Sequence, residues 1–263
     1  MRLSIGLDVT PDASSSDSAD AGQEAVPVDD PLALAAGYVR ATKLDDDPAS
    51  FRQALASLDR EVLAAALGSD GERVAFWLNV YNATVQDVLS ANPELFEKHG
   101  FPPRRPIFRR ELVTVAGESL RLDDVEHGIL RNSQSGVGLG YVPRFRKSAF
   151  ERAHRVAELD PRVHFALNCG ARSCPPVLAY DAADVDAQLD AATRSYLETE
   201  VSYDPESDVA RVPKLFSWYR GDFGGKPGIR AFLRDHDAIP ETADPSLAWA
   251  DYDWSLKLGQ FSD

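Results

Sequence analysis

The strongest helical pattern in the sequence lies between residues 71 and 92 (GERVAFWLNVYNATVQDVLSAN). Its apolar side chains recur three and four positions apart, which predicts a long helix with a broad buried face. Asn79, Asn82 and Gln86 share a second stripe on the same helix. Because asparagine is a poor helix former, these amides need an explanation. They either face a functional site or bind loop backbone at a buried edge.

The patterns around this helix predict one α+β domain over residues 30–263, in which N-terminal helices pack on a mixed or antiparallel sheet. Residues 1–29 are rich in Ala, Ser and Asp and poor in large apolar groups, which predicts a disordered acidic arm. Besides the central helix, we expect one helix that begins at Pro31 and further helices at residues 48–67, 124–131, 183–200 and 228–235. The strands that we expect lie at residues 163–167, 201–203, 209–212 and 252–256 and in a hairpin over 110–122.

The charge balance bears on partners and environment rather than on the fold. The chain has 28 basic and 42 acidic residues, a net charge of −14, with Asp 28 to Glu 14 and Arg 22 to Lys 6. An acidic, lysine-poor surface suits a high-salt cytoplasm, which favours a halophilic source, although a GC-rich genome would produce a similar bias. We expect neither nucleic acid nor a membrane as a partner. With no secretory signal and no membrane helix in the sequence, we expect a cytoplasmic protein.

Both cysteines, Cys169 and Cys174, lie in the run DPRVHFALNCGARSCPPV at residues 160–177, together with His164. The apolar stretch 163–167 predicts a buried strand, after which the two thiols follow on a loop, a common way to present reactive groups. Their spacing matches neither a CxxC redox motif nor a zinc knuckle. A local disulfide is disfavoured in a reducing cytoplasm. The alternative is that both thiols are inert core residues.

A second polar pair, Glu126 and His127, lies in the segment DVEHGILR. Asp123 and Glu126 have the spacing of a capping box, which predicts a purely structural role for Glu126 at the start of a helix. The alternative is that Glu126 and His127 face a site. A single histidine on a helix is more often structural than functional.

Four segments resemble one family, known as domain of unknown function 547. They are AFWLNVYNA (75–83), DVEHGILR (124–131), HFALNCGARSCPP (164–176) and KLFSWYRGDFG (214–224), and the closing YDWSL (252–256) resembles the end of the family. The resemblance implies that seven polar residues belong to a shared core motif: Asn79, Asn82, Glu126, His127, His164, Cys169 and Cys174. It also implies a similarity to papain-like and transglutaminase-like thiol enzymes. The chain departs from their plan, because no cysteine heads the early long helix.

Three functions are compatible with these residues. The first is a thiol-dependent hydrolase or acyl transferase, in which Cys174 or Cys169 is the nucleophile and His127 or His164 the base. Glu126 would orient the base, and either Asn79 or backbone N–H groups after Cys169 would stabilise an oxyanion. We favour Cys174, because it follows Arg172, whose charge would lower the pKa of a thiol.

The second function is a binding or scaffold module in which the same residues form a buried polar network. The third is a zinc site, although no local ligand pair supports it, and we predict neither metal nor cofactor. In any of the three cases, a substrate or protein partner of unknown identity would be bound. We expect Asn82, Arg172, Trp218 and Tyr219 to contribute to binding.

Overall fold

The computed structural model describes residues 26, 28–100 and 105–262. The predicted acidic arm, residues 1–29, lies almost wholly outside the described residues, so its disorder stays a prediction. Within the described part of the chain, no helix is long and apolar enough to cross a membrane.

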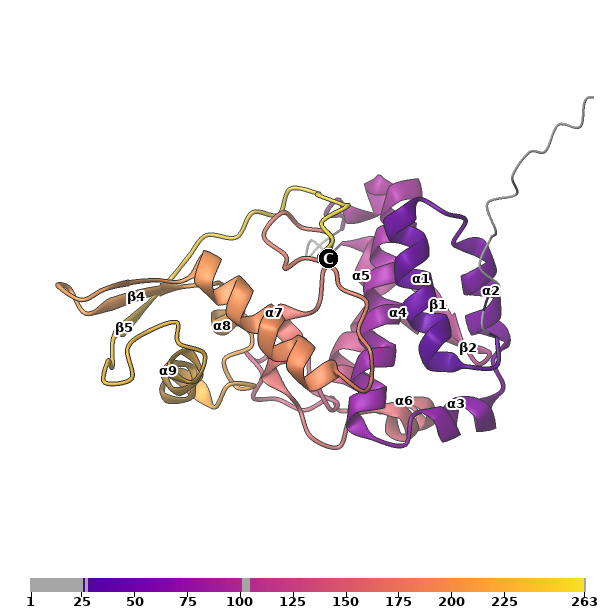
Figure 1. Ribbon diagram of the computed structural model, residues 1–263, viewed down its shortest axis with the longest axis horizontal. Coiled ribbons are helices and arrows are strands. Elements are labelled where there is room, and N and C mark those ends of the chain that lie inside the picture. Colours follow the sequence, from indigo (N-terminus) through magenta and orange to yellow (C-terminus); the bar gives the residue numbers. More distant parts are fainter. Residues whose placement is uncertain (1–25, 27, 101–104, 263) are drawn as a thin grey trace, which may run out of the picture.

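The long helix α4 (Asp70–Ala91) is the element around which the rest is packed, as the sequence predicts. It begins at a full capping box, in which the Ser69 hydroxyl accepts from the N–H of Glu72 and the Glu72 carboxylate accepts from the N–H of Ser69. Trp77, Leu78 and Tyr81 on this helix are fully buried. Helix α1 (Pro31–Leu44) runs beside α4 over much of its length, as Figure 1 shows.

The remaining elements are short. The helices are α2 (Ala49–Ser57), α3 (Arg60–Ala66), η1 (Pro93–Phe96), α5 (Pro106–Arg109), η2 (Asp124–Leu130), α6 (Ala149–His154), η3 (Pro161–Phe165), α7 (Val185–Glu200), α8 (Leu215–Trp218) and α9 (Gly225–Asp235). The strands are β1 (Glu111–Val115), β2 (Glu118–Arg121), β3 (Ser202–Asp204), β4 (Val209–Val212) and β5 (Ser246–Trp249).

The strands form two small sheets, so the fold is α+β as predicted. Strands β1 and β2 make the expected antiparallel hairpin, and β4 lies between antiparallel β3 and parallel β5. The hydrophobic residues form two clusters. The larger surrounds α4, and the smaller lies among α7, α8, α9 and the second sheet (Figure 1).

Three predicted elements are wrong, and each has a local cause. The helix expected over residues 48–67 divides, because the Asp59 side chain caps a new helix at Arg60. The strand expected at residues 163–167 is the 3₁₀ helix η3, since Asp160 accepts from the N–H of Arg162 and Pro161 starts a helical turn. The expected last strand is irregular apart from a bridge at Leu256, and β5 precedes it.

Candidate functional site

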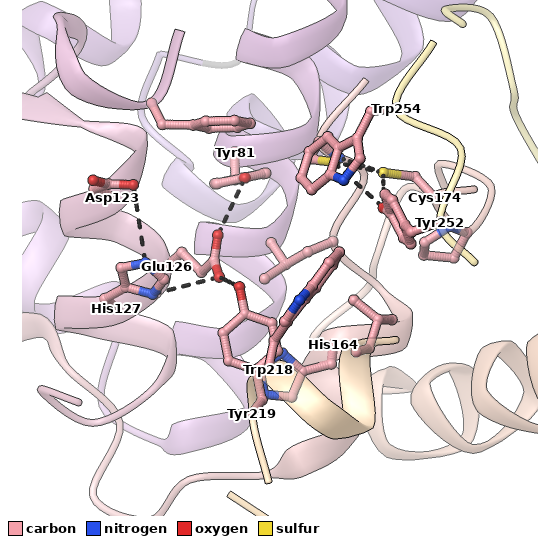
Figure 2. Close-up of a pocket in the computed structure, with 15 residues that line it drawn as sticks. Tyr81, Asp123, Glu126, His127, His164, Cys174, Trp218, Tyr219, Tyr252 and Trp254 are labelled. Atoms are coloured by element: carbon pink, nitrogen blue, oxygen red, sulfur yellow. Dashed lines mark hydrogen bonds and ion pairs between the residues drawn. The ribbon is translucent and has the colours of Figure 1, made fainter. Parts of the chain in front are cut away.

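Five of the seven polar residues of the predicted motif line one pocket of about 190 Å³ between the two hydrophobic clusters: Glu126, His127, His164, Cys169 and Cys174. Figure 2 shows two polar groups on opposite sides of it. We call Cys169, Cys174 and Tyr252 the sulfur wall, and Glu126 with His127 the acid wall. The other lining residues are mostly apolar or aromatic: Tyr81, Phe108, Asp123, His164, Leu167, Pro175, Leu215, Trp218, Tyr219 and Trp254.

In the sulfur wall the two thiols touch each other. Cys169 Sγ lies 2.8 Å from Cys174 Sγ, and both cysteines are free. Cys174 Sγ also accepts the backbone N–H of Cys169 at 3.0 Å and lies 3.2 Å from the Tyr252 hydroxyl. The sulfur of Cys174 is therefore surrounded by hydrogen-bond donors.

A rigid loop holds the two cysteines in this position. Asn168 accepts from the N–H of Gly170 at 2.9 Å and donates to the carbonyl of Pro175 at 2.7 Å, so one buried amide ties both ends of the loop. Gly170 has a φ of +89°, and a Cβ at this position would lie 2.8 Å from Leu89 Cδ1. Glycine is therefore required both by the backbone and by the close packing on α4.

The two thiols have different acidities. Burial opposes ionisation of Cys174, but hydrogen bonds from Cys169, Tyr252 and the loop backbone outweigh it and lower the pKa of Cys174. The hydrogen bond to Cys174, with burial, raises the pKa of Cys169 well above its ordinary value. Cys174 is thus the more acidic thiol of the pair, and Cys169 is the less acidic one, which favours donation from Cys169 to Cys174.

In the acid wall, Glu126 is a buried carboxylate held by two tyrosines. Its oxygens accept from Tyr219 at 2.7 Å and from Tyr81 at 3.3 Å (Figure 2). Burial alone would raise the pKa of Glu126, but the neighbouring His127 and Arg131 and the Tyr219 hydroxyl outweigh it, so the pKa is lowered. Glu126 is therefore ionised at neutral pH.

The predicted capping box at Asp123 is wrong. Asp123 has helical backbone angles and its side chain caps nothing, whereas Glu126 points to the tyrosines. The element η2 is a π-helix, and such wide turns occur often at functional sites. The wider turn alters the angular spacing of the side chains, so Glu126 and His127, adjacent in sequence, both line the pocket.

A buried ion cluster lies behind the acid wall. Arg131, with no exposed side-chain surface, donates two hydrogen bonds to Asp222, at 2.6 and 2.9 Å. His164 Nε2 also lies 2.8 Å from Asp222 Oδ2, and its ring stacks on Tyr219 at 4.1 Å. Burial lowers the pKa of His164 more than Asp222 raises it. His164 is therefore neutral and donates to Asp222.

Arg131 also determines the tautomer of the neutral His127 ring. Its NH1 lies 3.0 Å from His127 Nδ1, and Glu126 Oε1 is farther, at 3.4 Å. Since a guanidinium only donates, Nδ1 accepts and the proton of the neutral ring is on Nε2. In the described part of the chain, neither sulfur is hydrogen-bonded to a histidine. His127 thus has an N–H on the side opposite Arg131.

The glycine-rich segment after η2 closes over His127. A Cβ on Gly136 would lie 2.6 Å from His127 Nε2, so only glycine allows this approach. A wider groove of about 950 Å³ adjoins the pocket and shares Asp123, His127 and Trp254 with it. This groove gives a larger molecule a route to the pocket.

Other predicted site residues lie elsewhere. The amide of Asn79 exchanges two hydrogen bonds of 2.8 Å with the backbone of Tyr180. Asn82 binds the backbone of Ala166 and Asn168, at 2.9 and 2.8 Å. Arg172 lies on the surface beside Ser255. None of these three residues lines the pocket, whereas Trp218 and Tyr219 do.

The sequence interpretation missed four residues that build the site: Arg131, Asp222, Tyr81 and Tyr252. Each lies inside a segment that resembles the family, and Arg131 directly follows Ile129 and Leu130, while Asp222 directly precedes Phe223. A buried charge needs a partner, so these two opposite charges could have been paired in advance. The two tyrosines carried no such signal.

Among residues 26, 28–100 and 105–262, no three His, Cys, Asp or Glu side chains lie close enough together to hold a metal ion.

Comparison with known proteins identifies the family of the chain. Neither the curated proteins nor the solved structures contain a match to this chain. A family model matches residues 66–197, half of the chain, including Glu126, His127, His164 and both cysteines. The chain therefore belongs to the family described as "Protein of unknown function, DUF547".

Proposed function

We propose that the pocket is the active site of a thiol-dependent hydrolase or acyl transferase, with Cys174 as the nucleophile. One observation carries the proposal: Cys174 Sγ, at the pocket wall, has the Cys169 N–H, the Cys169 thiol and the Tyr252 hydroxyl within 3.0, 2.8 and 3.2 Å. Donors around a sulfur favour the thiolate, which is the nucleophilic form. A cytoplasmic location, expected from the sequence, would keep both thiols reduced.

The chemistry would proceed in two steps. The Cys174 thiolate attacks the carbonyl carbon of an ester, thioester or amide, and a thioester to Cys174 forms as the alcohol, thiol or amine leaves. Water or a second nucleophile then attacks this thioester, which releases the acyl group and restores the thiolate. The Tyr252 hydroxyl, beside the sulfur, would donate to the oxyanion that develops in each step.

The acid wall would bind the leaving group. Because Arg131 donates to His127 Nδ1, the Nε2–H would donate a hydrogen bond to the leaving group, which takes its proton from water. Glu126 lies 3.4 Å from Nδ1. This arrangement differs from the expected one, in which the histidine takes the proton of the thiol directly.

A second candidate is the binding or scaffold module. It is favoured by the ion cluster, in which Arg131 and Asp222 have no exposed side-chain surface and satisfy each other. Such a network would fix the fold without any chemistry. In that case both thiols would be inert packing residues.

An activated acyl probe separates the candidates. The protein is incubated with p-nitrophenyl acetate, and the acetylated residue is found by mass spectrometry after digestion. We expect one acetyl group on Cys174, none in Cys174→Ser, and retention of the adduct in Cys169→Ser. Replacing His127 with Ala removes the N–H that would bind the leaving group and should slow acetylation of Cys174.

Iodoacetamide provides an independent measurement with the same variants. A reactive thiolate predicts fast labelling of Cys174 below pH 7. If labelling occurs only in denaturant, the thiol is inert and the buried network explains the residues better. If labelling appears only after chelation, a zinc site explains them.

A further inference from the structure

The two sulfurs form a pair that acyl transfer does not require. Acyl transfer uses one thiol, yet a second thiol lies in contact with it at 2.8 Å. They are the two cysteines of the whole chain, separated by four residues. Only a small approach of the two sulfurs is needed to form a disulfide.

The loop is built so that this approach need not disturb the fold. The N–H groups of Arg172 and Ser173 bind the carbonyls of Ser255 and Asp253, at 2.9 and 3.3 Å. The carbonyl of Gly170 accepts from the N–H of Lys257 at 2.8 Å. The backbone between the cysteines is thus fixed to the C-terminal segment, which keeps the two sulfurs in contact.

The hydrogen bonds give the two thiols separate roles. Cys174 accepts the N–H of Cys169 and has the character of an attacking thiolate, whereas Cys169 donates and has the character of a thiol held in reserve. In redox-active cysteine pairs the more acidic thiol reacts and a resolving cysteine lies beside it. Here Cys174, the more acidic of the two, is buried, and Cys169 is partly exposed. Both sulfurs line the 190 Å³ pocket, so a small oxidant can reach them there.

We infer that this pair reduces hydroperoxides, with Cys174 as the attacking thiolate and Cys169 as the resolving thiol. This activity goes beyond acyl transfer and does not depend on it, although both would use Cys174. The aromatic side chains of Trp218 and Trp254 at the pocket favour a hydroperoxide with a small apolar group over a highly polar one.

The reaction balances in two steps. The Cys174 thiolate attacks the terminal oxygen of the hydroperoxide, an S–O bond forms, and the O–O bond breaks. The Tyr252 hydroxyl, 3.2 Å from the sulfur, donates a hydrogen bond to the alkoxide as it leaves, the alkoxide takes a proton from water, and Cys174 becomes a sulfenic acid. Cys169 then attacks this sulfur, the disulfide forms, and the hydroxyl leaves as water with the proton of the Cys169 thiol. An external dithiol restores both thiols.

The experiment uses the full chain with tert-butyl hydroperoxide, and with hydrogen peroxide for comparison. One equivalent of oxidant should convert the protein to a form two hydrogens lighter, with a peptide that joins Cys169 to Cys174. Dithiothreitol should reverse the change and, in excess, should support repeated consumption of the hydroperoxide. In Cys169→Ser the reaction should stop at the sulfenic acid, which dimedone traps on Cys174.

Matched variants test the geometry. Tyr252→Phe removes the hydroxyl beside both sulfurs and should slow peroxide consumption about tenfold, as expected for loss of one donor to the thiolate. Tyr203→Phe removes a hydroxyl that binds Asp208 outside the pocket and should have no effect.

Three results would overturn the inference. The first is oxidation of the protein no faster than oxidation of free cysteine. The second is oxidation of Cys174 to the sulfinic acid while Cys169 is still reduced. The third is consumption of hydroperoxide by Cys169→Ser at the same rate as by the wild type. The fate of the acyl-transfer proposal is separate, because acetylation of Cys174 is measured on the reduced protein. Either activity can therefore fail while the other is observed.

Discussion

The two walls of the pocket are built by different physical means. In the ion cluster behind the acid wall, opposite charges hold each other, as in the buried pair of Arg131 and Asp222, and Glu126 is held by the hydroxyls of two tyrosines. In the sulfur wall, the Cys169 N–H binds the Cys174 sulfur, and hydrogen bonds of Asn168 to the backbone fix the loop that carries both cysteines. One wall is an electrostatic unit and the other is a fixed loop that presents two thiols.

This difference predicts which property each wall controls. Removing one partner of a buried ion pair leaves an uncompensated charge, so changes near the acid wall should act on stability. The loop that carries the two thiols is held by backbone hydrogen bonds, so removing one side-chain donor to Cys174 should leave the fold intact. Changes in the sulfur wall should therefore alter the reactivity of Cys174. The predictions below test this division.

The largest effect should come from Asp222→Asn. The substitution keeps the shape but leaves the buried Arg131 without its counter-charge. We expect a loss of about 3–5 kcal/mol in the free energy of unfolding, measured with urea. The exposed pair of Arg172 and Asp253 provides the control, and Asp253→Asn should change stability very little. A loss as small as in that control would show that the cluster does not hold the acid wall.

The next effect concerns pH. Burial lowers the pKa of His164, so as the pH falls below about 6.5 the unfolded chain binds a proton that the folded protein resists, and stability falls. The pKa values of Glu126 and Asp222 are also lowered, and the stability that they contribute is present above about pH 4 and lost below it. Between about pH 7 and 5 the histidine therefore dominates within this cluster.

His164→Gln tests this assignment, because the amide keeps a donor to Asp222 and does not titrate. The decline in stability between pH 7 and 5 should become shallower, by up to about 1.4 kcal/mol per pH unit. Burial also lowers the pKa of His154, outside the pocket, so His154→Gln should flatten the curve further and independently. An unchanged slope in His164→Gln would remove this histidine from the acid response.

The elements that the sequence predicts best are those with local signals. Helix α4 and the hairpin of β1 and β2 follow from periodicity and from one turn. The amide stripe could be interpreted in two ways, and the observed one is backbone binding by Asn79 and Asn82.

The site depended on contacts that no local pattern contains. Arg131 and Asp222 are 91 residues apart, and Glu126 meets Tyr219 across 93. The π-helix departs from the 3.6-residue period on which the helix prediction rests, so the capping box at Asp123 was misleading. The 3₁₀ helix at His164 was mistaken for a strand because a short apolar run fits both. The similarity to papain-like enzymes stays a prediction.

A smaller effect should separate reactivity from stability in the sulfur wall. Tyr252→Phe keeps the ring beside Trp218 and Trp254 and removes one donor to Cys174. We expect the pKa of Cys174 to rise by about one unit, which slows iodoacetamide labelling below pH 7 about tenfold. Urea unfolding should show a loss of no more than about 1.5 kcal/mol. A large loss of stability with unchanged labelling would reverse the division between the walls.

The smallest effect concerns salt, and it compares both walls with the surface. With a net charge of −14, the folded protein should gain stability in molar KCl, by about 1 kcal/mol or less, because salt screens the repulsion between exposed carboxylates. The buried pair of Arg131 and Asp222 is screened much less. In thermal and urea unfolding across a KCl series, the free energy of unfolding should therefore rise by the same amount in the wild type and in Asp222→Asn. If salt reduces the difference in the free energy of unfolding between the two proteins, then salt screens the ion cluster, and the acid wall is not shielded from solvent ions. If salt stabilises neither protein, the acidic composition reflects genome bias rather than a halophilic source.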